Sequence, residues 1–307
     1  MSFLLPLSTV AIMVLYAVPG YLFLRTGAIR AEHIPPFAKV LLYLCQPCLT
    51  LYSFNKADYS LELLKNMGIF FLLSTVLQLL MLGGACLVLR KKCHQIRYRI
   101  FTVATVLGNV GFLGVPLLEA LLPEYSNAVA LSAAYIVSMN LISWTLGLTV
   151  ITKDKTYLSV KKILLSPPFL TLLIALPLFL TGSKLPSILE TPVSLLGKMT
   201  TPLCMLILGM RLATVPLQEL ISDWRVFFTC GAKQILFPLL SFAAVAFLPL
   251  EFYIKATLLI LCCCPTASVV QSLSELYGDG QQIAANTVLV STFLSVLTIP
   301  LMLSVLL

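Results

Sequence analysis

Charged side chains are scarce in this sequence. Only 10% of the 307 residues are Asp, Glu, Lys or Arg, whereas 59% are hydrophobic. Soluble domains carry about 25% charged residues, so a surface in contact with water cannot be built from this composition. The chain is therefore not expected to be a soluble protein, and its apolar segments are expected to lie in a lipid bilayer.

The side chains that catalytic and metal sites require are also few. There are only 2 His, both in basic segments, and the 12 Asp and Glu residues form no cluster in the sequence. The 9 Cys lie mostly in apolar runs, and the C-x-x-C of Cys45 and Cys48 has no further ligand at metal-binding spacing. We therefore expect no metal, no cofactor and no enzymatic activity.

Apolar runs long enough to cross a membrane recur along the whole chain. A helix needs about 20 apolar residues to cross the hydrocarbon core. The predicted transmembrane helices cover residues 4–24, 36–54, 67–89, 99–122, 127–151, 163–182, 188–210, 224–248, 252–274 and 283–306. This pattern predicts an all-α membrane protein with ten transmembrane helices.

The distribution of Lys and Arg supports that number of helices. One side of the membrane collects Arg25, Arg30, Lys39, Arg90, Lys91, Lys92, Arg97, Arg99, Lys153, Lys155, Lys161, Lys162, Arg211 and Arg225, and the other has Lys56, Lys65, Lys184, Lys198 and Lys255. Because basic residues are enriched in cytoplasmic loops, both termini are expected on the outer side of the cytoplasmic membrane. This orientation explains the net charge of +8, so we expect no nucleic-acid partner.

The two halves of the chain can be aligned at a shift of about 156 residues. The most informative aligned pairs are Gln78 with Gln234, Glu119 with Glu275 and, at a shift of 155, Pro47 with Pro202. The predicted units are a first repeat at 1–152, a short cytoplasmic connector at 153–162 and a second repeat at 163–307. Each repeat holds five predicted helices, an odd number, so the two repeats must have opposite orientations. Inverted repeats are typical of secondary transporters.

Two predicted helices contain residues that interrupt a helix. The run from Gly108 to Pro116 holds three glycines and a proline, and the run from Cys264 to Ser272 holds a proline and four polar side chains. Paired interruptions in corresponding helices indicate a substrate site near the middle of the membrane. Two half-helix N-termini facing each other there would favour an anion. The alternative is that these residues only permit close packing or a kink.

The expected substrate-binding residues come from these two runs. They are Asn109, Gly111, Gly114, Pro116, Pro265, Thr266, Ser268 and Gln271. Lys233 lies inside the eighth predicted helix, where it could compensate the charge of an anion or carry a proton, or could instead bind backbone carbonyls structurally. Gln78, Gln234 and Asn140 are expected to support the site or to join helices by hydrogen bonds.

At these interruptions the chain resembles the auxin efflux carrier family, which includes plant auxin exporters and bacterial permeases for malate and malonate. Asn109 to Pro116 is similar to the N-x-G-F-x-G-x-P pattern of the family. Pro265-Thr266-Ala267 followed by Glu275, Tyr277, Gly278 and Asp279 is similar to its P-T-A and E-x-Y-G-D patterns, and further matches are Gly20-Tyr21, Arg25, Gly27, Ser291-Thr292 and Pro300. Gln271 stands where bacterial relatives often have an aromatic residue.

The resemblance implies that helices 4 and 9 cross as broken helices. Helices 3–5 and 8–10 would form a transport domain that moves against a scaffold of helices 1, 2, 6 and 7, through which two copies would pair. The expected function is a carrier of small organic anions such as malate, malonate or auxin-like acids, with possible proton or sodium coupling. The alternatives are a sodium-coupled symporter of the bile-acid type and a transporter-derived sensor or channel. Glu119 and Glu275 are expected at the membrane interface.

Overall fold

The computed structural model describes residues 3–158, 167–277 and 279–307, and all regular secondary structure in these ranges is helical. The prediction of an all-α protein is therefore confirmed. Several predicted features lie outside the described residues: Lys161 and Lys162 in the connector, residues 163–166 of the sixth predicted helix, and Gly278.

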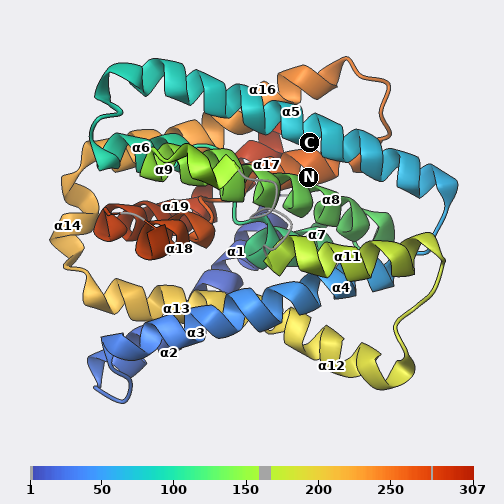
Figure 1. The fold of residues 1–307 in the computed structure, drawn as a ribbon, viewed down its shortest axis with the longest axis horizontal. Coiled ribbons are helices and arrows are strands. Elements are labelled where there is room, and N and C mark those ends of the chain that lie inside the picture. Colours follow the sequence, from blue (N-terminus) through green and yellow to red (C-terminus); the bar gives the residue numbers. More distant parts are fainter. Residues whose placement is uncertain (1–2, 159–166, 278) are drawn as a thin grey trace.

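The first half of the chain contains nine α-helices and six 3₁₀ or π turns, the latter labelled η (Figure 1). They are α1 (Leu4–Leu15), α2 (Ala17–Arg25), η1 (Ala31–His33), α3 (Ile34–Val40), η2 (Leu41–Cys45), α4 (Gln46–Lys56), α5 (Leu61–Leu89), η3 (Arg90–Lys92), α6 (Ile96–Ala104), η4 (Val110–Gly114), α7 (Val115–Leu121), α8 (Ser126–Ile142), η5 (Ser143–Gly147), α9 (Leu148–Thr152) and η6 (Lys155–Leu158). 

The second half is built in a similar way. Its elements are α11 (Pro167–Leu180), α12 (Ser187–Lys198), α13 (Thr200–Thr214), α14 (Leu217–Ser222), α15 (Trp224–Gly231), η7 (Ala232–Leu236), α16 (Phe237–Ala246), α17 (Phe252–Cys263), α18 (Ser268–Tyr277) and α19 (Gln281–Leu306). In Figure 1, α5 and α16 lie along one edge of the molecule and α2, α3 and α13 along the opposite edge. The interrupted helices lie between these edges.

Seven helical segments are long and apolar enough to cross a membrane, counted over the described ranges. They are Leu4–Arg25, Ala31–Lys56, Leu61–Lys92, Ser126–Thr152, Ser187–Thr214, Trp224–Ala246 and Gln281–Leu306, and each overlaps one predicted helix. The other three predicted helices contain the shorter apolar segments Val110–Leu121, Phe169–Leu180 and Phe252–Cys263. The chain is thus a multi-pass membrane protein, and the inverted repeat of ten helices stays a prediction.

Three of the π turns end two residues before a proline. They are η2 before Pro47, η4 before Pro116 and η7 before Pro238. Proline has no N–H group, and its ring clashes with the carbonyl four residues earlier in an α-helix. A π turn inserts an extra residue at that point and thereby accommodates the proline. The prolines therefore account for the position of η4, at the first interruption, and of η7, which carries Lys233.

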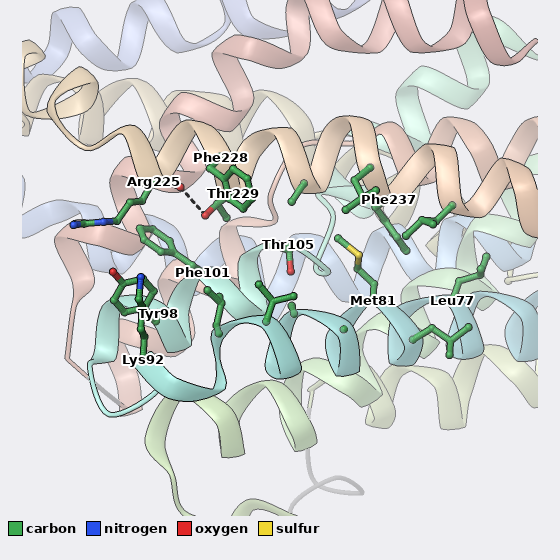
Figure 2. Close-up of a pocket in the computed structure, with 18 of the residues that line it drawn as sticks. Leu77, Met81, Lys92, Tyr98, Phe101, Thr105, Arg225, Phe228, Thr229 and Phe237 are labelled. Atoms are coloured by element: carbon green, nitrogen blue, oxygen red, sulfur yellow. Dashed lines mark hydrogen bonds between the residues drawn. The ribbon is translucent and has the colours of Figure 1, made fainter.

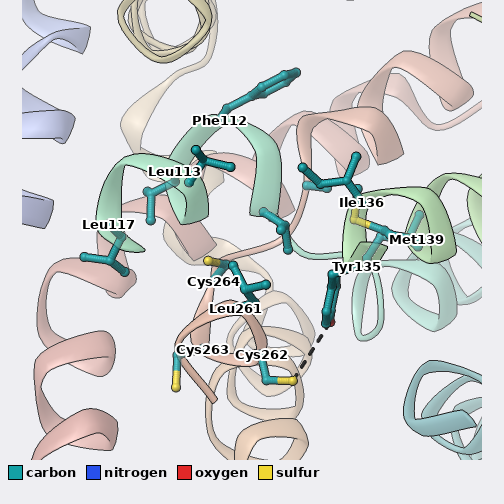
Figure 3. Packing of buried hydrophobic residues seen from close by; sticks show 14 of the residues in the cluster. Phe112, Leu113, Leu117, Tyr135, Ile136, Met139, Leu261, Cys262, Cys263 and Cys264 are labelled. Atoms are coloured by element: carbon teal, nitrogen blue, oxygen red, sulfur yellow. Dashed lines mark hydrogen bonds between the residues drawn. The ribbon is translucent and has the colours of Figure 1, made fainter. Parts of the chain in front are cut away.

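The apolar core surrounds the interrupted helices. Figure 3 shows side chains from η4, α7, α8 and the end of α17 packed together, with the hydroxyl of Tyr135 3.9 Å from the Cys262 Sγ. Gly114 makes this packing possible, because a Cβ at this position would lie 2.9 Å from Leu261 Cδ2 and 3.1 Å from Cys264 Sγ. The glycine brings the first interrupted helix close to the second.

A second close helix contact joins α2 to α13. A Cβ on Gly20 would overlap the Leu206 carbonyl oxygen, and a Cβ on Gly209 would overlap the Ala17 carbonyl oxygen. Small residues let helix backbones approach in a membrane, where packing replaces hydrophobic burial as the force for association. These two helices belong to the predicted scaffold.

Candidate functional site

The two interruptions bind to each other through their backbones. Gly108 and Thr266 form an antiparallel bridge, in which the Asn109 N–H donates to the Pro265 carbonyl at 2.7 Å and the Ala267 N–H donates to the Leu107 carbonyl at 2.9 Å. The bridge satisfies backbone groups that neither helix can pair internally, as a lipid environment requires. Non-helical backbone extends over 105–109 and 264–267, a shorter range than the sequence indicates.

Hydrogen bonds from neighbouring helices hold the second interruption in place. The Thr266 N–H donates to Ser291 Oγ at 2.7 Å, and Thr266 Oγ1 donates to the Ala104 carbonyl at 3.2 Å. The Gln234 Nε2 donates to the Ser291 carbonyl at 2.7 Å. Thr266 is fully buried, and both its N–H group and its hydroxyl are hydrogen-bonded. Its side chain therefore orders the point where the two interruptions meet, which we call the crossing, and does not face a cavity.

Two small cavities, each about 20 Å³, lie beside the crossing. The Asn109 cavity is lined by Leu42, Gln46, Leu49, Thr50, Gly108, Asn109, Val110, Gly111, Phe112, Ile136, Met139, Asn140, Ala267, Ser268 and Val269. The Arg211 cavity is lined by Ala38, Leu41, Leu42, Phe112, Cys204, Ile207, Leu208, Arg211, Ser268, Gln271 and Ser272. Both cavities share Leu42, Phe112 and Ser268, so they flank one point of the crossing.

The helices that follow the two interruptions both begin at the Asn109 cavity, which their first turns line. Val110 begins η4 and Ser268 begins α18, and both border this cavity. The first N–H groups of a helix have no partner within the helix, and the helix dipole adds partial positive charge there. The Val110 N–H itself donates to the Gly108 carbonyl at 2.8 Å, so the N–H groups that follow it are the ones open to a ligand. Together with the amides of Asn109 and Asn140, this arrangement can bind a carboxylate through hydrogen bonds.

The structure brings only some of the predicted site residues to the two cavities. Asn109, Gly111, Ser268 and Asn140 line the Asn109 cavity, and Gln271 and Ser268 line the Arg211 cavity. Pro265, Thr266 and Gly114 form the bridge or the packing around it, and Pro116 lies in the first turn of α7. Gln78 lies further away, where its Nε2 donates to Ser138 Oγ at 3.0 Å and to the Ser74 carbonyl at 3.1 Å.

Lys233 is fully buried next to the crossing. Its Nζ donates to the Cys262 carbonyl at 2.8 Å and lies 4.8 Å from the centroid of the Phe237 ring. A Cβ on Gly108 would lie 3.3 Å from the same Nζ. Within residues 3–158, 167–277 and 279–307, Lys233 has no carboxylate within ion-pair distance. The ammonium group thus lies at the C-terminal end of α17, which carries partial negative charge.

Several lining residues were not indicated by the interrupted runs. Gln46 and Thr50 on α4 contribute polar side chains to the Asn109 cavity, and Cys204 on α13 has its Sγ 3.6 Å from Ser268 Oγ. Thr201 Oγ1 also donates to the Phe112 carbonyl at 2.5 Å. Gln46 directly precedes Pro47, and a proline inside a predicted transmembrane helix was the available signal in the sequence.

Two ion pairs join α7 and α18, the α-helices that follow the two interruptions, to neighbouring helices. Glu119 on α7 accepts from Lys56 Nζ at 2.8 Å and from Tyr52 OH at 2.9 Å, both on α4. We call this contact the Glu119 pair. It connects the end of the first interrupted helix to the end of the second predicted helix.

The second contact, which we call the Glu275 pair, occupies the equivalent position in the other half. Glu275 on α18 accepts from Arg211 on α13 at 2.6 Å and from Gln271 Nε2 at 3.0 Å. Lys56 and Arg211 are 155 residues apart, and Glu119 and Glu275 are 156 apart, which are the shifts that align the two halves.

The chain is similar to one transporter and to one family model over nearly its whole length. An uncharacterized transporter of Methanocaldococcus jannaschii is 24% identical over 310 residues, which cover 97% of this chain and 98% of the relative. The model of a family described as membrane transport protein matches residues 6–161 and 155–303. A transporter family agrees with the expectation that the protein is not an enzyme. The chain therefore belongs to the membrane transport protein family, the family of the auxin efflux carriers.

Proposed function

We propose that this protein is a secondary carrier of small organic anions, mono- or dicarboxylates such as malate, malonate or auxin-like acids. The observation that supports the proposal best is the Asn109 cavity, where the first turns of two interrupted helices meet beside buried polar side chains. Transporters with discontinuous helices bind carboxylates at such half-helix N-termini. The membrane is proposed to be the cytoplasmic membrane, with both termini outside.

Substrate recognition would come from neutral hydrogen-bond donors supported by one buried cation. Asn109 is 3% exposed and Asn140 is 6% exposed, so a carboxylate bonded to their amides would be shielded from water. Such shielding strengthens electrostatic attraction between the anion and the helix dipoles. Lys233 adds positive charge behind Gly108 without lining the cavity, so we propose that it stabilises the crossing.

The size of the cavities supports a mechanism of alternating access. A volume of about 20 Å³ holds roughly one water molecule, so a dicarboxylate fits only if α4 and α13 separate from the crossing. We propose that helices 3–5 and 8–10 move as a transport domain against the scaffold of helices 1, 2, 6 and 7, within the inverted repeat of ten helices. Two copies would associate through the scaffold.

The proposed transport is tested by flux into liposomes that contain the purified protein. The panel is malate, malonate, succinate, lactate and indole-3-acetate, each with and without a pH, sodium or voltage gradient. Saturable uptake and counterflow of at least one acid are expected, and the gradients separate proton or sodium coupling from uniport. A flux that neither saturates nor shows counterflow would indicate a channel, and no flux of any acid would contradict the proposed substrate class.

Asn109→Ala is the matching site variant. It should lower carboxylate uptake at subsaturating concentration by about tenfold, which corresponds to about 1.4 kcal/mol for a lost buried hydrogen bond. Asn127→Ala is the control, because Asn127 lies in the first turn of α8 and is only partly buried. Equal uptake by the two variants would contradict the placement of the site at Asn109.

A further inference from the structure

A long apolar groove lies between α5 and the continuous segment α15–η7–α16, apart from the two cavities at the crossing. Its volume is about 640 Å³, within the range of about 300–1,000 Å³ that is typical of small-molecule sites. Leu77, Met81 and Val88 line it from α5, and Leu236, Phe237 and Leu240 line it from η7 and α16 (Figure 2). Gly84 leaves room in its wall, because a Cβ there would meet no atom within 4 Å.

One end of the groove is basic and aromatic. Figure 2 shows Lys92, Tyr98 and Arg225 together at this end, while Leu77 and Phe237 lie at the other. Lys92 Nζ lies 5.3 Å from the centroid of the Tyr98 ring, and the guanidinium carbon of Arg225 lies 5.9 Å from the centroid of the Trp224 ring. At these distances cation–π attraction holds both cations in position. 

The charge at this end remains positive after its acidic neighbour is included. Asp223 lies 3.7 Å from Arg225 and 3.5 Å from Arg97, and it is the one carboxylate paired with these cations in the described part of the chain. Arg97, Arg225 and Lys92 therefore outnumber it. Exposed apolar side chains flank the groove, with Leu80 68% and Val88 77% exposed, so the groove opens toward the hydrocarbon of the bilayer.

We propose that this groove binds one anionic glycerophospholipid. The phosphate would lie between Lys92 and Arg225, and an acyl chain would extend past Gly84 toward Leu77. Basic pockets between transmembrane helices on the cytoplasmic side bind anionic headgroups, and Trp and Tyr favour the headgroup level. Lys92 and Arg225 belong to the basic residues that the sequence places on the cytoplasmic side. A water-soluble anion would gain nothing from the apolar length of the groove.

Trp224 provides a direct reporter, since it lines the groove at its basic end. The protein has 2 Trp, so Trp144→Phe leaves Trp224 as the single tryptophan, whose fluorescence can be excited selectively. This variant, purified in detergent, is titrated with dibrominated phosphatidylglycerol or dibrominated phosphatidylcholine, whose bromines quench on contact. Phosphatidylglycerol should give saturable quenching at a lipid-to-detergent ratio about tenfold lower, because the basic residues at this end of the groove attract its anionic headgroup.

Matched substitutions in the Trp144→Phe protein test the headgroup position and the acyl-chain position separately. Lys92→Gln should reduce the preference for phosphatidylglycerol to about twofold or less, and the neighbouring Lys91→Gln, outside the groove, should retain it. Gly84→Phe should remove saturable quenching by both lipids. Gly83→Phe adds the same ring to the adjacent open position and should leave quenching unchanged. Proteins are compared only if their size-exclusion profiles match.

Three results would overturn the proposal. They are equal quenching by both lipids in the Trp144→Phe protein, an unchanged preference in Lys92→Gln, and unchanged quenching in Gly84→Phe. The first and third would show that only ordinary boundary lipid surrounds Trp224, and the second would show that the anionic headgroup does not bind at Lys92. If Gly84→Phe does not fold, the comparison of Lys92→Gln with Lys91→Gln still decides whether an anionic headgroup binds there.

Discussion

Lys233 shows how a single residue can carry charge at the centre of a membrane protein. A buried ammonium is costly unless it is bonded, and here one carbonyl and one aromatic ring face it from α17 and α16. The carbonyl belongs to the last turn of α17, where the helix ends before it can supply the N–H four residues on that would normally donate to it. The cation therefore offsets the partial negative charge created by the interruption.

Lys233→Met tests this role, because methionine keeps most of the volume and removes the charge and the donors. We expect the free energy of unfolding to fall by about 1–3 kcal/mol, the cost of an unpaired buried acceptor. Thermal unfolding of the purified protein measures it. In the control Lys255→Met, the lost bond to the Ala246 carbonyl is exposed, and water can replace it. Unchanged stability with weaker anion binding would instead make Lys233 a counter-ion for the substrate.

At the residue scale, the sequence predicted part of the candidate site. Asn109 and Ser268 were indicated because polar and helix-breaking residues are conspicuous in an apolar segment. Gln46, Thr50 and Cys204 lie on helices without an interruption. Their contribution depends on which face of α4 and α13 turns toward the crossing, and that is a property of helix packing.

At the scale of elements, glycine and proline position helices in opposite ways. Proline is accommodated by the π turns that displace side chains along η2, η4 and η7. Glycine allows the backbones of α2 and α13 to touch at Gly20 and Gly209. This contact is inflexible, because the atoms that a new side chain would meet are backbone atoms.

Gly20→Ala and Gly68→Ala should therefore change stability in opposite directions. In Gly20→Ala, overlap with the Leu206 carbonyl should lower the free energy of unfolding by about 1–3 kcal/mol. In Gly68→Ala, a Cβ would meet no atom within 4 Å, so the higher helix propensity of alanine should raise it by about 0.5–1 kcal/mol. Chemical or thermal unfolding of both proteins measures the difference, and a Gly20→Ala protein that loses no stability would show that α2 and α13 can separate without cost.

At the scale of the whole molecule, the two ion pairs connect the proposed transport domain to the proposed scaffold. The Glu119 pair joins α7 to α4, and the Glu275 pair joins α18 to α13. The distribution of basic residues predicts that they lie on opposite sides of the membrane. Opening one side would then require that side's pair to break while the other pair remains.

Glu275→Gln should make Cys204, which lines the Arg211 cavity and is 2% exposed, more accessible from the cytoplasmic side. In a protein that retains only this cysteine, labelling by an impermeant maleimide in inverted vesicles should rise about fivefold, equivalent to about 1 kcal/mol. Glu119→Gln is the matched control and should not raise labelling from that side. Equal increases in both variants would contradict separate roles for the two pairs.

The sequence by itself determined the membrane location, the approximate helices and the positions of the two interruptions. Hydropathy and helix-breaking residues act within one segment, so they can be interpreted without knowing its neighbours. Only the tertiary structure decided that Gly108 pairs with Thr266, that Lys233 bonds to the Cys262 carbonyl, and that the two glutamates bind basic residues on α4 and α13. The bridge and the Glu119 pair join segments far apart in the chain, and their partners depend on how the helices pack.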